Sequence, residues 1–259
     1  MVDVERRAVS LSGELGSGKS SVAELLGDAL GARRISTGAA QRQIAEQRGV
    51  STLELNRLAE TDPSIDDEID AVFRSLAGVG EPLIVDSRLA WHFLPDSFKV
   101  HLVVEPSVGA SRVHSRQGAR AERYETTEEA LEMIERRVRS ERRRFQVLYG
   151  VDIFLLRNYD LVVDTSEASP GQVAERVLAA YAGGPTAGGP TLYLAPSRIG
   201  SAPSTGREAD PRDDAPLRVT YRRPRFTTAD AEVLGVAVAR GAALVPAVLE
   251  DEVVASDDG

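Results

Sequence analysis

The sequence contains no cysteine, which excludes disulfides, thiolate catalysis and cysteine-ligated metal sites. The three histidines, His92, His101 and His114, are not spaced like zinc ligands. Lysine is almost as scarce, because Lys19 and Lys99 are the two that occur and arginine supplies every other cationic side chain. This scarcity directs attention to Lys19, which lies inside a glycine-rich run.

Long hydrophobic runs are also missing. No segment approaches the roughly 18 apolar residues of a membrane-spanning helix, and the first ten residues lack the pattern of a signal peptide. We therefore expect a cytoplasmic protein without a membrane partner. A net charge of −9 argues against nucleic acid as a partner. The 259 residues suffice for one sizeable core and a small additional module.

Five short apolar runs predict β-strands, and helical patterns lie between them. The runs are residues 7–12, 32–37, 82–87, 99–105 and 159–166. Several are nearly continuous in Val, Leu and Ile, as expected for strands covered on both faces. The alternation of strands and helices predicts an α/β fold of three layers, with a five-stranded parallel sheet in the middle.

The composition also predicts how the chain is divided. We assign residues 1–182 to the α/β domain, with two helical insertions at 36–75 and 111–150. Residues 183–216 are rich in Gly, Pro and Ser and predict a linker. Residues 217–259 form a small accessory module, which is a candidate for homodimerisation.

A phosphate-binding loop follows the first predicted strand. The run "GELGSGKS" (13–20) fits G-x-x-x-x-G-K-[ST] and precedes a predicted helix. Glycines allow successive N–H groups to surround phosphate oxygens, and the helix adds the positive end of its dipole. Lys19 neutralises the β- and γ-phosphates, and the Ser20 hydroxyl suits Mg²⁺. The motif predicts an ATP site made of Gly13, Glu14, Leu15, Gly16, Ser17, Gly18, Lys19, Ser20 and Ser21.

A second magnesium ligand is predicted at the end of the third strand. In "PLIVDS" (82–87), four apolar residues lead to Asp86, the pattern of a Walker B strand in P-loop NTPases. An aspartate that merely forms a turn is the alternative. Together with the phosphate loop, Asp86 predicts a P-loop NTPase fold that uses ATP and Mg²⁺.

Further motifs occur in the same order as in a known family. An "STG" turn (36–38) is followed by "AETDPSIDDEID" (59–70), the arginine-rich "RRVRSERRR" (136–144) and "YGVD…YDLVVDT" (149–165). Across about residues 7–180 the sequence resembles the cytidylate kinase family, especially its archaeal-type branch. The resemblance implies a P-loop nucleoside monophosphate kinase that phosphorylates CMP or dCMP.

The resemblance also implies which residues bind the acceptor. Ser36, Thr37 and Gly38 would form the turn at the monophosphate site, while Arg42 and Arg88 would hold the acceptor. The planar fork of an arginine suits phosphate oxygens, so the assignment is chemically reasonable. For each arginine, a simple ion pair with a nearby carboxylate is the alternative.

The second insertion resembles a lid that carries arginines. Arg137 and Arg144 match the family's lid arginines, and Arg112 and Arg116 are further candidates. Such cations can neutralise the charge that spreads over a migrating phosphoryl group when the lid closes. The acidic residue that usually follows the first of them is replaced here by Val138.

Acidic residues of both insertions are candidates for contacts with the acceptor. Asp66, like its neighbours Asp62 and Asp70, would meet the base or ribose, or would lie on a solvated helix face. By resemblance, Asp152 would bind the acceptor ribose or a lid arginine.

One departure from the family leaves the substrate open. Ala40 and Gln41 stand where members usually have an aromatic or bulky apolar residue. A kinase of the same fold for a modified pyrimidine nucleotide or another small metabolite is therefore an alternative, and an ATP-binding regulator is a third. The segment 191–259 faintly resembles ParB-like modules but lacks their histidine-arginine signature, which predicts an accessory role. The expected partner is a small-molecule nucleotide.

Overall fold

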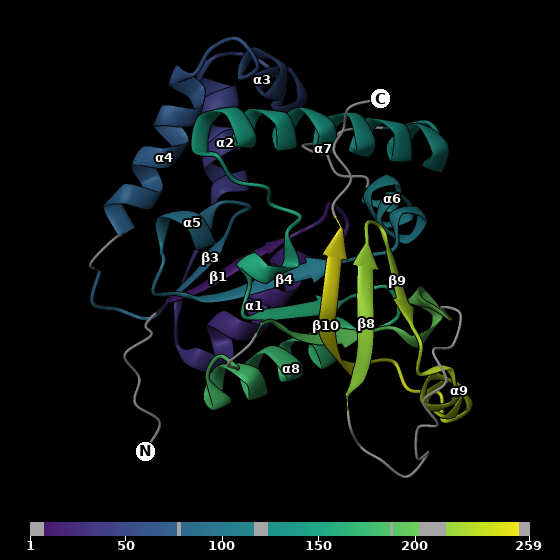
Figure 1. Cartoon of the computed structure of the whole chain (residues 1–259). Coiled ribbons are helices and arrows are strands. Elements are labelled where there is room, and N and C mark those ends of the chain that lie inside the picture. The colour runs from purple at the N-terminus through teal and green to yellow at the C-terminus, as the bar shows by residue number, and fades with distance from the viewer. Residues whose placement is uncertain (1–7, 77–78, 117–123, 187–188, 202–215, 254–259) are drawn as a thin grey trace.

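The computed structural model describes residues 8–76, 79–116, 124–186, 189–201 and 216–253. One ten-stranded sheet runs through the molecule (Figure 1). Its first half is parallel and has the order β2-β3-β1-β4-β5. These strands are β1 (Ala8–Gly13), β2 (Arg33–Ser36), β3 (Leu83–Asp86), β4 (Phe98–Val103) and β5 (Leu161–Asp164). The predicted α/β P-loop NTPase fold is thereby confirmed, but the parallel part of the sheet has six described strands and not the five predicted, because β6 (Thr191–Leu194) also pairs in parallel with β5.

Helices cover both faces of this half of the sheet. On one face, α1 (Lys19–Leu30) packs against α8 (Pro170–Gly183) over a core that includes Leu11, Val100 and Val163. The other face carries α5 (Ala90–Phe93) and α7 (Thr127–Tyr149), which contacts α6 (Pro106–Ser115). Among the described residues, no helix is both long and apolar enough to cross a membrane.

The segment between β2 and β3 folds as three helices. They are α2 (Thr37–Gln47), α3 (Thr52–Leu58) and α4 (Ser64–Leu76). Ile44, Leu55, Ile65 and Phe73 bury their side chains in a separate small core that also contacts β3. This is the helical insertion predicted over residues 36–75. In Figure 1 these helices and α7 lie above the carboxyl ends of the parallel strands.

The second half of the sheet comes from the end of the chain. We call β6 to β10, with the short helices between them, the C-terminal strands. β6 is parallel to β5 and β10 is antiparallel to β6, and the order then continues β8-β9-β7. Their bounds are β6 (Thr191–Leu194), η2 (Pro196–Arg198), β7 (Ile199–Ser201), β8 (Leu217–Arg222), β9 (Arg225–Thr228), α9 (Ala231–Ala239) and β10 (Val245–Val253).

The C-terminal strands differ from the prediction of a linker over residues 183–216. Residues 191–201 contribute two strands, and residues 202–215 lie outside the described part of the chain. Leu192 and Leu194 are fully buried and alternate with the half-buried Thr191 and Tyr193. The alternation extends over a run of residues too short to predict a strand among the surrounding glycines and prolines. The strand is stabilised by its pairing with β5.

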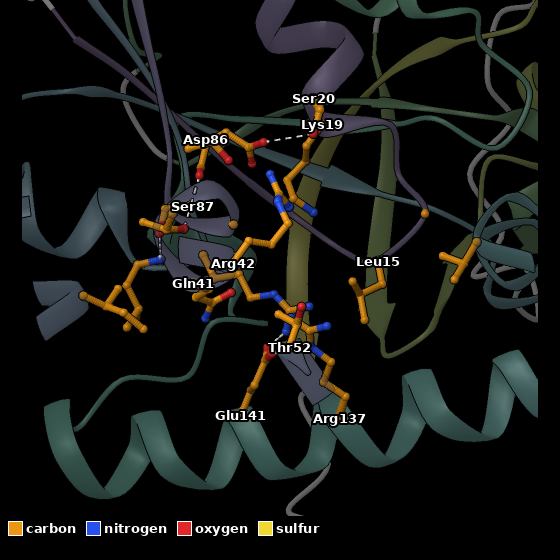
Figure 2. Close-up of a pocket in the computed structure, with 18 of the residues that line it drawn as sticks. Leu15, Lys19, Ser20, Gln41, Arg42, Thr52, Asp86, Ser87, Arg137 and Glu141 are labelled. Atoms are coloured by element: carbon orange, nitrogen blue, oxygen red, sulfur yellow. Dashed lines mark hydrogen bonds and ion pairs between the residues drawn. The ribbon is translucent and has the colours of Figure 1, made fainter. Parts of the chain in front are cut away.

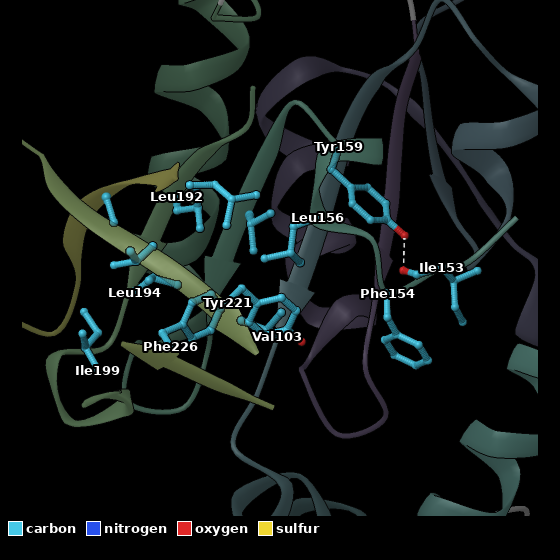
Figure 3. Packing of buried hydrophobic residues seen from close by; sticks show 14 of the residues in the cluster. Val103, Ile153, Phe154, Leu156, Tyr159, Leu192, Leu194, Ile199, Tyr221 and Phe226 are labelled. Atoms are coloured by element: carbon cyan, nitrogen blue, oxygen red, sulfur yellow. Dashed lines mark hydrogen bonds between the residues drawn. The ribbon is translucent and has the colours of Figure 1, made fainter. Parts of the chain in front are cut away.

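The two halves of the sheet share one hydrophobic core (Figure 3). Leu192, Tyr221 and Phe226 of the C-terminal strands belong to the same buried cluster as Val103 and Leu156. The rings of Tyr221 and Phe226 stack with their centroids 4.7 Å apart. The C-terminal strands are therefore packed against the rest of the molecule and extend its sheet.

Candidate functional site

The phosphate loop connects β1 to α1 and depends on glycine at two positions. Gly18 caps α1 with a φ of 80°, a left-handed conformation that glycine adopts without strain. Gly16 lies so close to α6 that an added Cβ would come within 2.3 Å of the carbonyl oxygen of Gly109. The loop can therefore curl at the start of α1, with its N–H groups available to phosphate oxygens.

Lys19 lies at the centre of the loop. Its Nζ donates hydrogen bonds to the carbonyl oxygens of Gly13 at 2.7 Å and Glu14 at 2.9 Å. Burial lowers the pKa of Lys19 to about 8, and the nearby carboxylate of Asp86 acts in the opposite direction. A half-buried ammonium group held by two carbonyl oxygens is well suited to an anionic ligand, which would compensate its charge.

Ser20 and Asp86 stand next to each other beside the loop. The Ser20 hydroxyl donates to Oδ2 of Asp86 at 3.2 Å, and Thr37 donates to the Asp86 carbonyl oxygen at 3.3 Å. No group of three or more His, Cys, Asp or Glu side chains gathers around a metal position within the described residues. Mg²⁺ is usually bound by one or two protein oxygens together with substrate phosphates, so this hydroxyl and carboxylate fit that ion.

A cavity of about 330 Å³ connects the phosphate loop to the helical insertion of residues 36–75 and to α7. In Figure 2, Lys19 and Asp86 lie on one side, and Arg137 and Glu141 project from α7 on the other. Fourteen predicted site residues line it: Leu15, Gly16, Gly18, Lys19, Ser20, Ser36, Thr37, Gly38, Arg42, Asp66, Asp86, Arg88, Arg137 and Arg144. The structure therefore brings residues from both insertions and three strand ends to one place.

Three arginines and two carboxylates face the loop across this cavity. We call Arg88, Arg137, Arg144, Glu141 and Asp66 the arginine cluster. The Glu141 carboxylate pairs with both Arg88 and Arg137, in the second case at 2.7 Å, and Arg144 Nε lies 3.0 Å from Oδ2 of Asp66. Burial lowers the pKa of Arg88 to about 9, with Arg137 and Arg144 acting in the same direction.

Burial excludes a solvated helix face for Asp66 and Asp70 but not for Asp62. Asp66 and Asp70 are buried and face the arginine cluster and Tyr149, whose hydroxyl donates to Asp70 at 2.8 Å. Burial raises the pKa of both carboxyls, and Arg144 opposes the shift at Asp66. Asp62 lies on the surface, where it is 3.4 Å from Arg48.

Five predicted site residues do not line the cavity: Gly13, Glu14, Ser17, Ser21 and Asp152. Ser17 shapes the loop from within, because its hydroxyl donates to the Glu14 carbonyl oxygen at 2.7 Å. Of the two partners expected for Asp152, the structure shows the second: its carboxylate is 2.7 Å from Arg142 of α7, an arginine of the predicted lid. An arginine that is equally buried satisfies this carboxylate outside the cavity.

The two further candidates for lid arginines also differ in whether they line the cavity. Arg116 lines the cavity, whereas Arg112 donates a hydrogen bond to the carbonyl oxygen of Thr165 at 2.8 Å. Residues 117–123 of the predicted lid lie outside the described part of the chain.

Sequence reasoning missed Glu141, a central member of the cluster. Only 4% of its side chain is exposed, and it joins two arginines that are far apart in sequence. A signal was present, because Glu141 lies three residues after Val138 and four before Phe145, on the apolar face of α7. A carboxylate on such a face needs a buried partner, which would have identified it.

A parallel sheet whose strands end at a phosphate loop, with arginines on two inserted helical segments opposite, is the arrangement of a P-loop nucleotide kinase. The chain belongs to the cytidylate kinase-like family, whose model matches residues 8–167. The C-terminal strands lie outside this match.

Individual relatives agree with this assignment. The chain is 41% identical over 157 residues to a cytidylate kinase from Methanothrix thermoacetophila. The matched region covers 61% of this chain and 87% of that protein. It is 34% identical over 174 residues to an S-adenosylmethionine-dependent nucleotide dehydratase from Lacinutrix mariniflava, covering 67% of this chain and 35% of that protein. The solved structure of an uncharacterized protein from Eubacterium ventriosum covers 67% of this chain and 97% of its own with a TM-score of 0.50, and its 16% identity supports the fold alone.

Proposed function

We propose that this protein transfers the γ-phosphoryl group of ATP to CMP or dCMP and releases ADP. The observation that carries the proposal is the cavity itself, in which a half-buried lysine and a cluster of arginines face each other. A phosphate donor held at one side and a phosphate acceptor at the other would meet end to end. The cytidylate kinases among the relatives support the pyrimidine monophosphate as acceptor.

The donor is held by the phosphate loop. Lys19 and the N–H groups at the start of α1 bind the β- and γ-phosphate oxygens. Ser20 and Asp86 are the residues that would hold Mg²⁺, which neutralises charge on the β- and γ-phosphates when bound.

The acceptor phosphate is held by arginine. Arg42 and Arg88 bind its oxygens, and Arg137 and Arg144 bind the group in transfer as charge accumulates on it. An acceptor oxygen attacks the γ-phosphorus in line, the bond to the β–γ bridging oxygen breaks, and ADP leaves. The attacking oxygen is already anionic, so the step requires no general base.

A second candidate is a kinase for a modified pyrimidine nucleotide. Gln41 lines the cavity beside Arg42 and offers an amide where family members usually have an aromatic or bulky apolar side chain. The similarity to part of a nucleotide dehydratase also favours a nucleotide as the substrate. In this reading the phosphate contacts stay the same and the base contacts differ.

One assay tests both candidates. ADP production is measured with Mg·ATP and either CMP, dCMP, UMP, AMP, GMP or no acceptor. Turnover strongest with CMP or dCMP is the expected result. Silence with all five and tight ATP binding would contradict the leading proposal and favour the modified nucleotide, or a protein that binds ATP to regulate another. The homodimer through the C-terminal module stays a prediction, which light scattering of the full chain tests.

A further inference from the structure

The C-terminal strands reach the phosphate loop through one side chain. Arg223, in the turn between β8 and β9, places its Nη2 3.8 Å from Oε1 of Glu14. The same guanidinium lies over the ring of Phe154, with its central carbon 3.6 Å from the ring centroid. The side chains of Arg223 and Glu14 are 24% and 14% exposed. This is a partly buried contact between a segment outside the family match and a residue of the ATP motif.

The turn that carries Arg223 is itself fixed in position. Arg198 donates a hydrogen bond to the carbonyl oxygen of Pro224 at 3.0 Å. Its guanidinium also lies 3.6 Å from the fully buried carboxylate of Asp164 and 3.4 Å from the hydroxyl of Ser166, at the end of β5. Arg198 therefore ties the β8–β9 turn to the edge of the parallel sheet where the phosphate loop lies.

Glu14 connects this contact to the atoms that hold Lys19. Its Oε2 accepts a hydrogen bond from the backbone N–H of Val104 at 2.8 Å, and its own N–H donates to Leu102 at 2.9 Å. Its carbonyl oxygen accepts from Lys19. Burial raises the pKa of Glu14, while the Val104 N–H and Arg223 act in the opposite direction. Without these partners, a carboxylate at this position would be unfavourable, because it would lie desolvated and unpaired next to a loop that binds an anion.

We propose that Arg223 is a positioning residue of the phosphate loop: it holds the Glu14 carboxylate against the end of β4, and the C-terminal strands are thereby part of the ATP site. The inference rests on the proposed use of ATP and concerns only the donor side. It assigns a role to a segment that the family model does not contain.

The test compares Arg223→Met with two other changes. Arg223→Met should weaken binding of Mg²⁺ with a non-hydrolysable ATP analogue by about tenfold, the size of a typical coupling between residues in contact. Calorimetry measures this without any acceptor. Arg225→Met, at the exposed first position of β9, is the matched control and should bind like the parent. The double variant Arg223→Met with Glu14→Gln removes both charges and should recover most of the loss.

Steady-state kinetics separates positioning from general damage. The KM for ATP should rise in Arg223→Met while the KM for the acceptor stays the same. The inference is overturned if Arg223→Met binds the analogue like the parent, if both KM values rise together, or if Glu14→Gln gives no recovery. Failure of the parent to bind the analogue would overturn the proposed function and this inference together. Binding without transfer to any tested nucleotide would overturn the acceptor alone, and the calorimetry would still decide the role of Arg223.

Discussion

The two sides of the cavity differ in how their charged groups are held. On the donor side, Lys19 is held by backbone carbonyl oxygens of its own loop. In the arginine cluster, charged side chains from the loop after β3, from α4 and from α7 hold one another by ion pairs. A backbone cradle forms with the local fold, whereas a set of buried ion pairs forms only when distant segments come together. Apart from the contact of Arg223 with Glu14, the donor side should therefore tolerate changes elsewhere, and the arginine cluster should be sensitive to each of its members.

The largest effect should come from the donor side. Lys19→Ala removes the cation that neutralises the donor phosphates, and ADP production should fall by about 10²-fold or more. The other lysine of the chain provides a matched control, because Lys99→Ala leaves the phosphate loop unchanged. Equal loss in both variants, or normal turnover in Lys19→Ala, would contradict the role of the loop.

The arginine cluster should respond to the loss of its shared carboxylate. Glu141→Gln removes the carboxylate that pairs with Arg88 and Arg137, and the free energy of unfolding should fall by about 3 kcal/mol, as expected for breaking a buried pair. Added CMP or inorganic phosphate should restore part of the loss, because its oxygens replace the carboxylate. Thermal unfolding with and without these anions measures both effects.

A matched control exists on the same helix. Glu132 pairs with Arg136 at 3.6 Å, and both side chains are well exposed. Glu132→Gln should change the free energy of unfolding by less than about 1 kcal/mol, because exposed ion pairs contribute little. If the two variants unfolded alike, the cluster would not be the buried, coupled unit described above.

The pH dependence should report the donor side. Lys19 has a pKa lowered to about 8, so it loses its positive charge as the pH rises through that value. A neutral amine binds phosphate weakly, and kcat/KM for ATP should therefore fall above about pH 8. In Lys19→Arg the charge persists and this step should be absent, whatever the residual activity. A parent profile that stays flat to about pH 10 would contradict the assignment.

The smallest effect should concern the base of the acceptor. Gln41→Phe introduces the kind of side chain usual in the family, and kcat/KM should shift toward CMP by about tenfold or less, as is typical for a single pocket contact. The ratio of kcat/KM for CMP to that for UMP is the measurement, with Gln43→Phe, further along α2, as control. An unchanged ratio would show that Gln41 does not contact the base.

The donor side could be predicted from the sequence because its residues are neighbours in the chain. Gly16, Gly18, Lys19 and Ser20 lie within one loop, where the conformation is determined locally. Asp86 could be predicted for a related reason, since the carboxyl ends of parallel strands meet at one edge of the sheet. Both were assigned from the pattern alone.

The rest depends on contacts between distant residues. Glu141 pairs with Arg88 across more than fifty positions, and no local pattern encodes that pair. The sequence left Asp152 between the acceptor ribose and a lid arginine, and the fold pairs it with Arg142 of α7. β6 could not be predicted, because a run of four residues between prolines and glycines does not by itself indicate a strand. Its pairing with β5 stabilises it.

The pairing of β6 with β5 has a consequence for shortened forms of the protein. A chain cut after α8 would retain every residue assigned here to donor and acceptor except Arg223. It would, however, expose the backbone N–H and C=O groups along the outer side of β5, together with apolar side chains such as Leu156 and Val162. An unprotected strand edge beside an apolar surface recruits other chains. A chain of the minimal length of a family member would thus leave this sheet edge exposed, because the C-terminal strands cover it in this protein.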